Sequence, residues 1–367
     1  MASKIRLGFV GANVNSHWAS QSHFPAVMAH PDVEMTAVCT TKPDTAEAAR
    51  KHFGAKLAFS DAAEMARSPE IDAVVVVVRV PSHYGPTMAA IQAGKPVYTE
   101  WPLGRTTSEA EEMTALARKK GVLAAVGLQS RVSPALLYMK ELIETGYVGR
   151  VLACNVATLR DGPAQRPSSR SWQRDFTLGA NTLTIANGHS IDALRFVVGD
   201  FASVAGNVTT QVKQWYEPDT QQTVEVSSPD NILVSGQLKS GAVASVHTGA
   251  VPWAGNGFRM EIYGTEGTLT ATGNISSQRG EMLRIRGAQK SQELKELPLP
   301  DRYNFVPTDF PKGDPYNVGQ MYALFAEAIR TGKPPARLPL FETAVELHHF
   351  TDTIKRASDT GTTLPVA

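Results

Sequence analysis

Hydrophobic positions in the first 125 residues follow two alternating patterns. Short β-branched runs, of which residues 73–78 form the most apolar, alternate with longer stretches that have helical spacing. The short runs predict strands that are covered on both faces, and the longer stretches predict helices. The predicted strands are 5–10, 34–39, 57–58, 73–78, 96–98 and 123–126. One predicted helix ends near residue 30, and the others cover 45–53, 61–67, 84–93 and 108–119. This alternation is typical of a parallel sheet with right-handed crossovers.

The pattern changes after residue 133. Helices are expected at 134–145, 184–198, 318–331 and 340–358, with a polar, arginine-rich loop at 160–174. Strands are expected at 151–158, 204–212, 231–238, 243–248, 258–263, 268–271 and 282–286. Their hairpin spacing predicts a mostly antiparallel sheet. We therefore expect an α/β protein with a parallel-sheet domain at 1–129 and an α+β domain with a large open sheet at 130–367.

Composition narrows the class of protein. The length of 367 residues fits two domains, and 42% hydrophobic with 19% charged residues is ordinary globular composition. A net charge of +1 without a basic tract indicates neither a nucleic acid nor a membrane as partner. We find no signal-peptide pattern, and the two cysteines suggest neither a disulfide framework nor a metal site. A cytoplasmic location is expected.

The turn after the first strand carries the first chemical signal. A dinucleotide-binding turn needs a glycine for its tight bend and small residues where the backbone meets the pyrophosphate. Segment 8–13 reads Gly-Phe-Val-Gly-Ala-Asn, so Gly11 is present, and Asn13 occupies the place of the second glycine. Asparagine tolerates the left-handed conformation better than most residues. We predict that Gly11, Ala12, Asn13 and Val14 bind the cofactor; the alternative is an α/β domain with an empty turn.

The end of the second strand bears on the choice of cofactor. An acidic residue there would bind the ribose of NAD and repel the 2′-phosphate of NADP. The chain has Thr40, Thr41 and Lys42 instead, which suit a phosphate. This favours NADP over NAD, although Lys42 could equally be a solvated loop residue.

Longer segments resemble a known family. Val-Pro-Ser-His at 80–83, Ala-Gly-Lys-Pro-Val-Tyr-Thr-Glu-Trp-Pro-Leu at 93–103, Gly-His-Ser-Ile-Asp at 188–192 and Glu-Ile-Tyr-Gly-Thr-Glu-Gly-Thr-Leu at 261–269 resemble the glucose–fructose oxidoreductase / inositol dehydrogenase (Gfo/Idh/MocA) family. The resemblance implies a Rossmann domain at 1–129 and hydride transfer on sugars, cyclitols or related polyols. It also implies an open C-terminal sheet that forms a homodimer or homotetramer.

Two departures from the family pattern concern catalysis. The family usually has Glu-Lys-Pro, whose lysine assists proton transfer, whereas this chain has Trp101 between Glu100 and Pro102. The family's aspartate, four residues before the histidine, is Ile185 here, so only His189 remains. A subgroup that includes the yeast galactose-pathway repressor, a regulator without known turnover, shares these departures together with Trp18-Ala19, 23–26, 82–84 and Leu128-Gln129.

Hydride transfer needs a group that exchanges the hydroxyl proton. His189 is the first candidate because imidazole titrates near neutral pH, but it could also be a packed helix residue. Tyr84 could relay a proton, Glu100 could orient a neighbour, and Trp101 could stack on a ring or simply fill the space of the lysine. The remaining predicted cofactor contacts are Val80, Pro81, His83, Glu100, Trp101 and Gln129. The predicted substrate contacts are Trp101, Arg131, Arg170, Trp172, Asn181, Thr184, Asn187, His189 and Trp253.

Three functions fit these residues. The first is an NAD(P)-dependent oxidoreductase acting on a ring carbon of a sugar, cyclitol or modified sugar. The second is an NAD-dependent glycoside hydrolase that works by transient oxidation and elimination. The third is a non-catalytic, NAD(P)-sensing regulatory protein.

Overall fold

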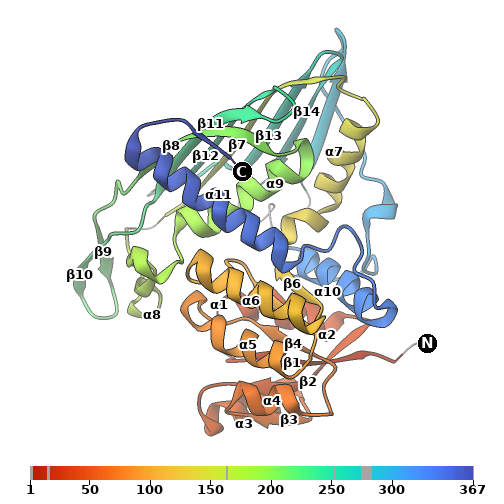
Figure 1. The fold of residues 1–367 in the computed structure, drawn as a ribbon, viewed down its shortest axis with the longest axis vertical. Coiled ribbons are helices and arrows are strands. Elements are labelled where there is room, and N and C mark those ends of the chain that lie inside the picture. Colours follow the sequence, from red (N-terminus) through yellow and green to blue (C-terminus); the bar gives the residue numbers. More distant parts are fainter. Residues whose placement is uncertain (1–2, 15–16, 163, 252, 274–282, 367) are drawn as a thin grey trace. The chain divides into compact units, whose positions relative to one another are not determined.

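The computed structural model describes residues 3–14, 17–162, 164–251, 253–273 and 283–366. The chain forms two compact units (Figure 1). The first combines Met1–Val132 with Asn304–Glu346, and the second combines Ser133–Tyr303 with Leu347–Ala367. Among the described residues, no helix has the length and apolar character that crossing a membrane would require.

The first unit is built on a six-stranded parallel sheet in the order β3-β2-β1-β4-β5-β6. Its strands are β1 (Ile5–Val10), β2 (Val33–Cys39), β3 (Leu57–Phe59), β4 (Ala73–Val76), β5 (Val97–Glu100) and β6 (Ala124–Gly127). Its helices include α1 (His17–Gln21), α2 (His23–Ala29), α3 (Pro43–Phe53), α4 (Ala62–Arg67), α5 (Tyr84–Gln92) and α6 (Thr107–Lys120). The predicted parallel Rossmann sheet is confirmed, and its strand order reverses between β1 and β4.

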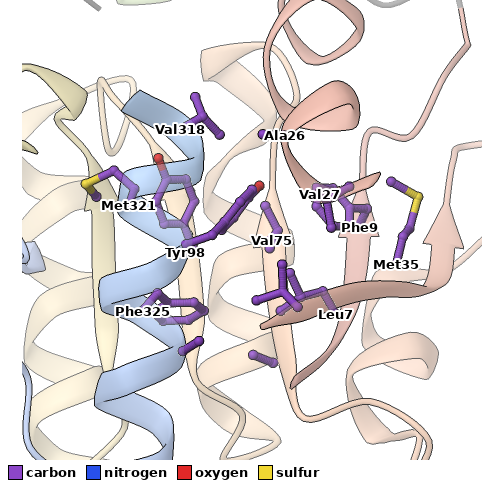
Figure 2. Packing of buried hydrophobic residues seen from close by; sticks show 14 of the residues in the cluster. Leu7, Phe9, Ala26, Val27, Met35, Val75, Tyr98, Val318, Met321 and Phe325 are labelled. Carbon is purple, nitrogen blue, oxygen red and sulfur yellow. The ribbon is translucent and has the colours of Figure 1, made fainter. Parts of the chain in front are cut away.

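One helix of the first unit comes from far along the chain. The expected boundary placed all of 130–367 in the second domain, but α10 (Asp314–Thr331) packs with the Rossmann sheet. Its Tyr322 and Phe325 are fully buried beside Tyr98 of β5, with ring centroids 5.7 and 6.1 Å away. Figure 2 shows Phe325 of α10 next to Tyr98. Periodicity predicts a helix here, but it cannot say which core the apolar face of that helix enters.

The second unit has a nine-stranded sheet in the order β16-β15-β14-β13-β7-β12-β11-β8-β17. Among the described strands of this sheet, only β7 and β12 pair in parallel, so the predicted mostly antiparallel sheet is confirmed. The strands are β7 (Val151–Asp161), β8 (Phe201–Thr209), β11 (Asn231–Leu238), β12 (Val243–Val251), β13 (Gly257–Gly264), β14 (Gly267–Gly273), β15 (Arg284–Gln289), β16 (Lys295–Glu296) and β17 (Leu364–Pro365). Helices α7 (Pro134–Glu144) and α9 (Gly188–Val198) belong to this unit, and α11 (Phe341–Thr360) spans both.

The polar regions differ most from expectation. The predicted loop at 160–174 contains α8 (Ser168–Ser171) and a 3₁₀ turn (Trp172–Arg174). A separate hairpin of β9 (Gln214–Glu217) and β10 (Gln222–Glu225) was not expected, because its strands are mostly polar and exposed. The strand expected at 282–286 begins outside the described residues, and β15 starts at Arg284.

The placement of α10 leads to a stability prediction. Phe325→Ala leaves a cavity in the core of the first unit, which costs about 3–5 kcal/mol. We expect faster hydrogen exchange in β1 and β4, measured by mass spectrometry, with little change in β12. Exposed Glu327→Ala on the same helix is the control. Equal acceleration in β4 and β12 would contradict the assignment of α10 to the first unit.

Candidate functional site

The turn after β1 has the shape that a dinucleotide turn requires. Gly11 has φ +94°, and a Cβ there would lie 2.2 Å from the Val77 carbonyl oxygen. The Gly11 N–H donates to the Cys39 carbonyl at 3.0 Å, so the turn is held between the ends of β2 and β4. Ala12 is buried, whereas Asn13 is exposed and Val14 is half-buried. Because only glycine fits against Val77 at this positive φ, the turn has the tight bend of a dinucleotide-binding turn, and these residues fit an NAD-type cofactor.

Part of the loop after β2 is engaged in hydrogen bonds within the loop and with the start of α3. The Thr40 hydroxyl donates to the Lys42 carbonyl at 3.0 Å and lies 2.6 Å from the Thr45 hydroxyl. Thr41 and Lys42 are exposed at the start of α3, where the helix dipole also favours an anion. Asp44 lies in the first turn of the same helix, and its carboxylate would repel an anion there. Thr41 and Lys42 are therefore the candidates for contact with a 2′-phosphate, and Thr40 is less available.

The end of β5 holds a buried carboxylate. Glu100 Oε2 accepts from Trp18 Nε1 at 2.7 Å. Its Oε1 accepts from Gln129 Nε2 at 2.7 Å and from Tyr98 OH at 3.0 Å. His23 Nε2 lies 3.3 Å from the same oxygen, at ion-pair distance. These partners come from α1, α2, β5 and the 3₁₀ turn after β6 (Gln129–Val132), so the carboxylate connects four segments.

The partners of Glu100 determine its charge. Burial alone would raise the pKa of Glu100, but the charge and hydrogen bond of His23 and the bonds from Trp18 and Tyr98 outweigh it and lower the pKa. Burial raises the pKa of Tyr98 and Tyr322 well above the usual value, so both phenols stay protonated. The carboxylate is therefore anionic and the phenols are neutral near pH 7.

The segment between β4 and α5 is linked to the segment after β5. Each ring nitrogen of His83 faces a carbonyl: Nδ1 lies 2.8 Å from Pro102 O, and Nε2 lies 3.1 Å from Val78 O. Burial lowers the pKa of His83, the two carbonyl partners act in the opposite direction, and these partners indicate a structural role. Val80 and Pro81 form the adjoining 3₁₀ turn, and Trp101 is 5% exposed.

Tyr84 is placed differently from the expected proton relay. Its hydroxyl donates to Glu112 Oε2 at 2.7 Å on α6, and this bond raises the pKa of Tyr84. The contact connects two helices. A catalytic role for Tyr84 remains a prediction that this placement does not favour.

In the second unit, buried polar side chains gather where a π-helix (Thr182–Asn187) runs into α9. Asn181 Oδ1 accepts from the backbone of Leu183 and Thr184, and the Thr184 hydroxyl accepts from Asn181 N at 3.0 Å. Asn187 Oδ1 accepts from the Thr248 hydroxyl at 3.3 Å. The side-chain NH₂ groups of Asn181 and Asn187 are buried and have no partner among the described residues. They could donate to substrate hydroxyls.

His189 is 4% exposed in the first turn of α9, next to Ser190, whose hydroxyl lies 2.8 Å from that of Thr158. The structure thus places Asn187 and His189 on one continuous helical segment, and Asn181 caps the start of that segment. Sequence periodicity detected the helix but not its π-helical start.

The arginine-rich loop is anchored to the unexpected hairpin. The guanidinium of Arg166 lies 3.9 Å from the centroid of the Trp215 ring, and its Nη1 donates to Gln173 Oε1 at 2.8 Å. Burial lowers the pKa of Arg166 to about 10. Arg170 is exposed and Trp172 is half-buried. Arg166 therefore packs against protein, and Arg170 remains the more accessible cation.

Two other predicted substrate contacts differ in exposure. Arg131, in the turn after β6, is half-buried, whereas Trp253 is 84% exposed after β12.

Within the described part of the chain, no group of three or more His, Cys, Asp or Glu residues could hold a metal ion.

Comparisons with known proteins agree with this geometry. Residues 5–128 match the oxidoreductase family with an NAD-binding Rossmann fold (Gfo/Idh/MocA), and residues 134–273 match the C-terminal domain of Gal80p. The chain is 33% identical to the dehydrogenase aclE of Aspergillus oryzae, over 74% of this chain and 78% of that protein. It is 28% identical to the galactose/lactose metabolism regulatory protein GAL80 of Saccharomyces cerevisiae, over 74% of this chain and 68% of that protein.

Solved structures share the fold. A super-repressor mutant of Gal80p from Saccharomyces cerevisiae superposes with a TM-score of 0.87 at 23% identity, covering 99% of this chain and 98% of the other. Levoglucosan dehydrogenase in complex with NADH and levoglucosan superposes with a TM-score of 0.86 at 22% identity, covering 99% and 100%. The glycine turn, the family match over 5–128 and the 33% identical relative together show that the chain belongs to the Gfo/Idh/MocA oxidoreductase family, in a subgroup that resembles Gal80.

Proposed function

We propose that this protein is an NAD(P)-dependent oxidoreductase that transfers a hydride between nicotinamide and a ring carbon of a sugar, cyclitol or modified sugar. The observation that carries the proposal is the cofactor half of the site. A turn that only glycine fits and a buried, anionic Glu100 both lie at the carboxyl edge of a doubly wound sheet. The dehydrogenase relatives support this activity.

The residues of this chain divide the chemistry as follows. The turn at Gly11 binds the pyrophosphate through its backbone, and the cofactor supplies the hydride acceptor when bound. During oxidation of the substrate, His189 would take the proton of the reacting hydroxyl. Asn181 and Asn187 hold substrate hydroxyls through their side-chain NH₂ groups. Trp101 cannot exchange a proton, so its place is packing or stacking against a ring.

A second candidate is a regulatory protein without turnover. It is favoured by the match of residues 134–273 to the C-terminal domain of Gal80p and by the similarity to GAL80. The missing lysine at Trp101 also agrees with it. Such a protein would keep the cofactor site and would use binding as its signal.

We propose that the second unit also forms a homo-oligomer through the outer face of its sheet. Leu233, Val243 and Tyr263 are 47%, 62% and 38% exposed. The register pairs Leu233 with His247, and pairs Val243 and Tyr263 with Ala153, so all of them share one face. Exposed apolar residues on a wide sheet are typical of a subunit interface.

The activity is tested by screening sugars, cyclitols and glycosides at 340 nm with NAD and NADP. We expect net cofactor reduction or oxidation with one sugar class. Consumption of a glycoside without a net change at 340 nm would favour the redox glycosidase. Binding of the cofactor without any turnover would favour the regulator.

His189→Ala is expected to lower kcat about 100-fold, because a general base contributes on that scale. The Kd for the cofactor alone should stay within about twofold of wild type, which separates loss of the base from loss of the fold. Exposed His52→Ala is the control. Activity near that of wild type would remove His189 from the mechanism.

Cofactor choice is predicted from the loop after β2. We expect the wild-type protein to bind NADP more tightly than NAD, measured by calorimetry. Lys42→Glu should weaken NADP binding at least about tenfold relative to NAD, because it sets a carboxylate against the 2′-phosphate. Lys51→Glu, an exposed charge reversal at the other end of α3, should change neither. A clear wild-type preference for NAD would refute the prediction.

The oligomer is predicted to depend on the outer sheet face. Leu233→Lys with Val243→Lys should convert the assembly to monomers in light scattering, because like charges would meet across the interface. Lys239→Glu, on the turn between β11 and β12, is the control. A wild-type monomer at micromolar concentration would contradict the proposal.

A further inference from the structure

The carboxylate of Glu100 is fixed in place by its surroundings. Both of its oxygens are engaged, and a Cβ on Gly127 would lie 2.2 Å from Oε1, so the group also packs against the backbone of β6. Trp18 and His23 belong to sequence motifs without an assigned role, and the structure gives both the same partner. Such a cluster fixes one negative charge in one place.

The charge of this cluster follows from its hydrogen bonds. Trp18, Gln129 and Tyr98 are neutral donors. His23 Nδ1 lies 2.6 Å from Tyr322 OH, whose phenol is protonated. Because these three donors are neutral, the imidazole of His23 is the one partner in the cluster that can offset the charge of the Glu100 carboxylate.

In other family members, the residue that follows the glutamate adds a charge next to the carboxylate. In the usual Glu-Lys-Pro pattern, an ammonium follows the carboxylate and the pair has no net charge. Here Trp101 follows Glu100, so the compensating cation is missing. Among the described residues, His23 is the only cation-forming side chain within ion-pair distance of Glu100.

The sheet topology indicates which part of a cofactor would meet this charge. The strand order reverses between β1 and β4, so a dinucleotide lies across that point with its pyrophosphate at Gly11. The loop after β2 receives the adenosine half, and the other half extends over the ends of β4 and β5. Glu100 is the last residue of β5, on the nicotinamide side.

We propose that Glu100 acts as a fixed anion that favours the oxidised, positively charged nicotinamide over the reduced, neutral ring. This inference rests on the proposed function and deepens it, because it sets the direction of the bound equilibrium. Reduction of the ring adds a hydride and removes its positive charge, so an anion nearby opposes that step. The bound equilibrium therefore moves toward oxidised cofactor and alcohol, formed from the carbonyl substrate, one hydride from the cofactor and one proton.

The test compares the Kd of the oxidised and reduced cofactor by calorimetry. Glu100→Gln alone would bring an amide NH₂ against the Trp18 N–H, so Trp18→Phe is combined with it. The double variant should raise the Kd of the oxidised form about tenfold relative to that of the reduced form. Trp18→Phe alone keeps the charge and should leave the ratio within about twofold of wild type. Exposed Glu327→Gln removes a distant charge and should do the same.

A second variant keeps Glu100 in place. Trp101→Lys restores the family's cation and should shift the ratio in the same direction, which makes the test independent of how well the double variant folds. An unchanged ratio in both Trp101→Lys and the double variant would overturn the inference while leaving the proposed function standing. A wild-type protein that binds neither form of the cofactor would instead contradict the proposed function, and this inference with it.

Discussion

The buried carboxylate of Glu100 is the interaction on which the cofactor domain depends. A carboxylate is stable in a protein interior only when hydrogen-bond donors replace its water. Trp18, His23, Tyr98 and Gln129 supply these donors from separate segments of the chain. Meeting that requirement brings α1, α2 and the turn after β6 to the end of β5. The same arrangement leaves an oriented negative charge at the edge of the sheet where a dinucleotide binds.

The helix α10 completes this arrangement from a distant part of the sequence. Its Tyr322 contacts His23 and packs on Tyr98, so the polar cluster and the aromatic core share residues. A change in the core would therefore alter the partners of the carboxylate, and the stability and chemistry of this domain are coupled through α10. This also explains why the first unit needs residues 304–346 in addition to its own alternating strands and helices.

Replacement of the usual lysine by Trp101 affects more than proton transfer. It removes a base, and it also removes the cation that would balance Glu100. An enzyme can function without the lysine if His189 exchanges the proton. A regulator without turnover needs no proton-exchanging group in its place. Both outcomes agree with a family subgroup whose relatives include a dehydrogenase and GAL80. The cofactor half of the site is therefore common to the two functions, and the proton-exchanging group is what distinguishes them.

The sequence by itself determined the features that depend on local spacing. Alternating hydrophobic runs were sufficient to predict the parallel sheet and the antiparallel sheet, and the segment around Gly11 was sufficient to predict the dinucleotide turn. These patterns depend on residues that are close together in the sequence. Only the tertiary structure decided that Trp18, 82 residues away, donates to Glu100, and that Tyr322, 299 residues from His23, contacts that histidine. It also decided that α10 joins the first unit and that Arg166 packs on Trp215. Such contacts depend on which apolar faces meet in the folded chain, and the spacing of residues along the chain does not encode that choice locally.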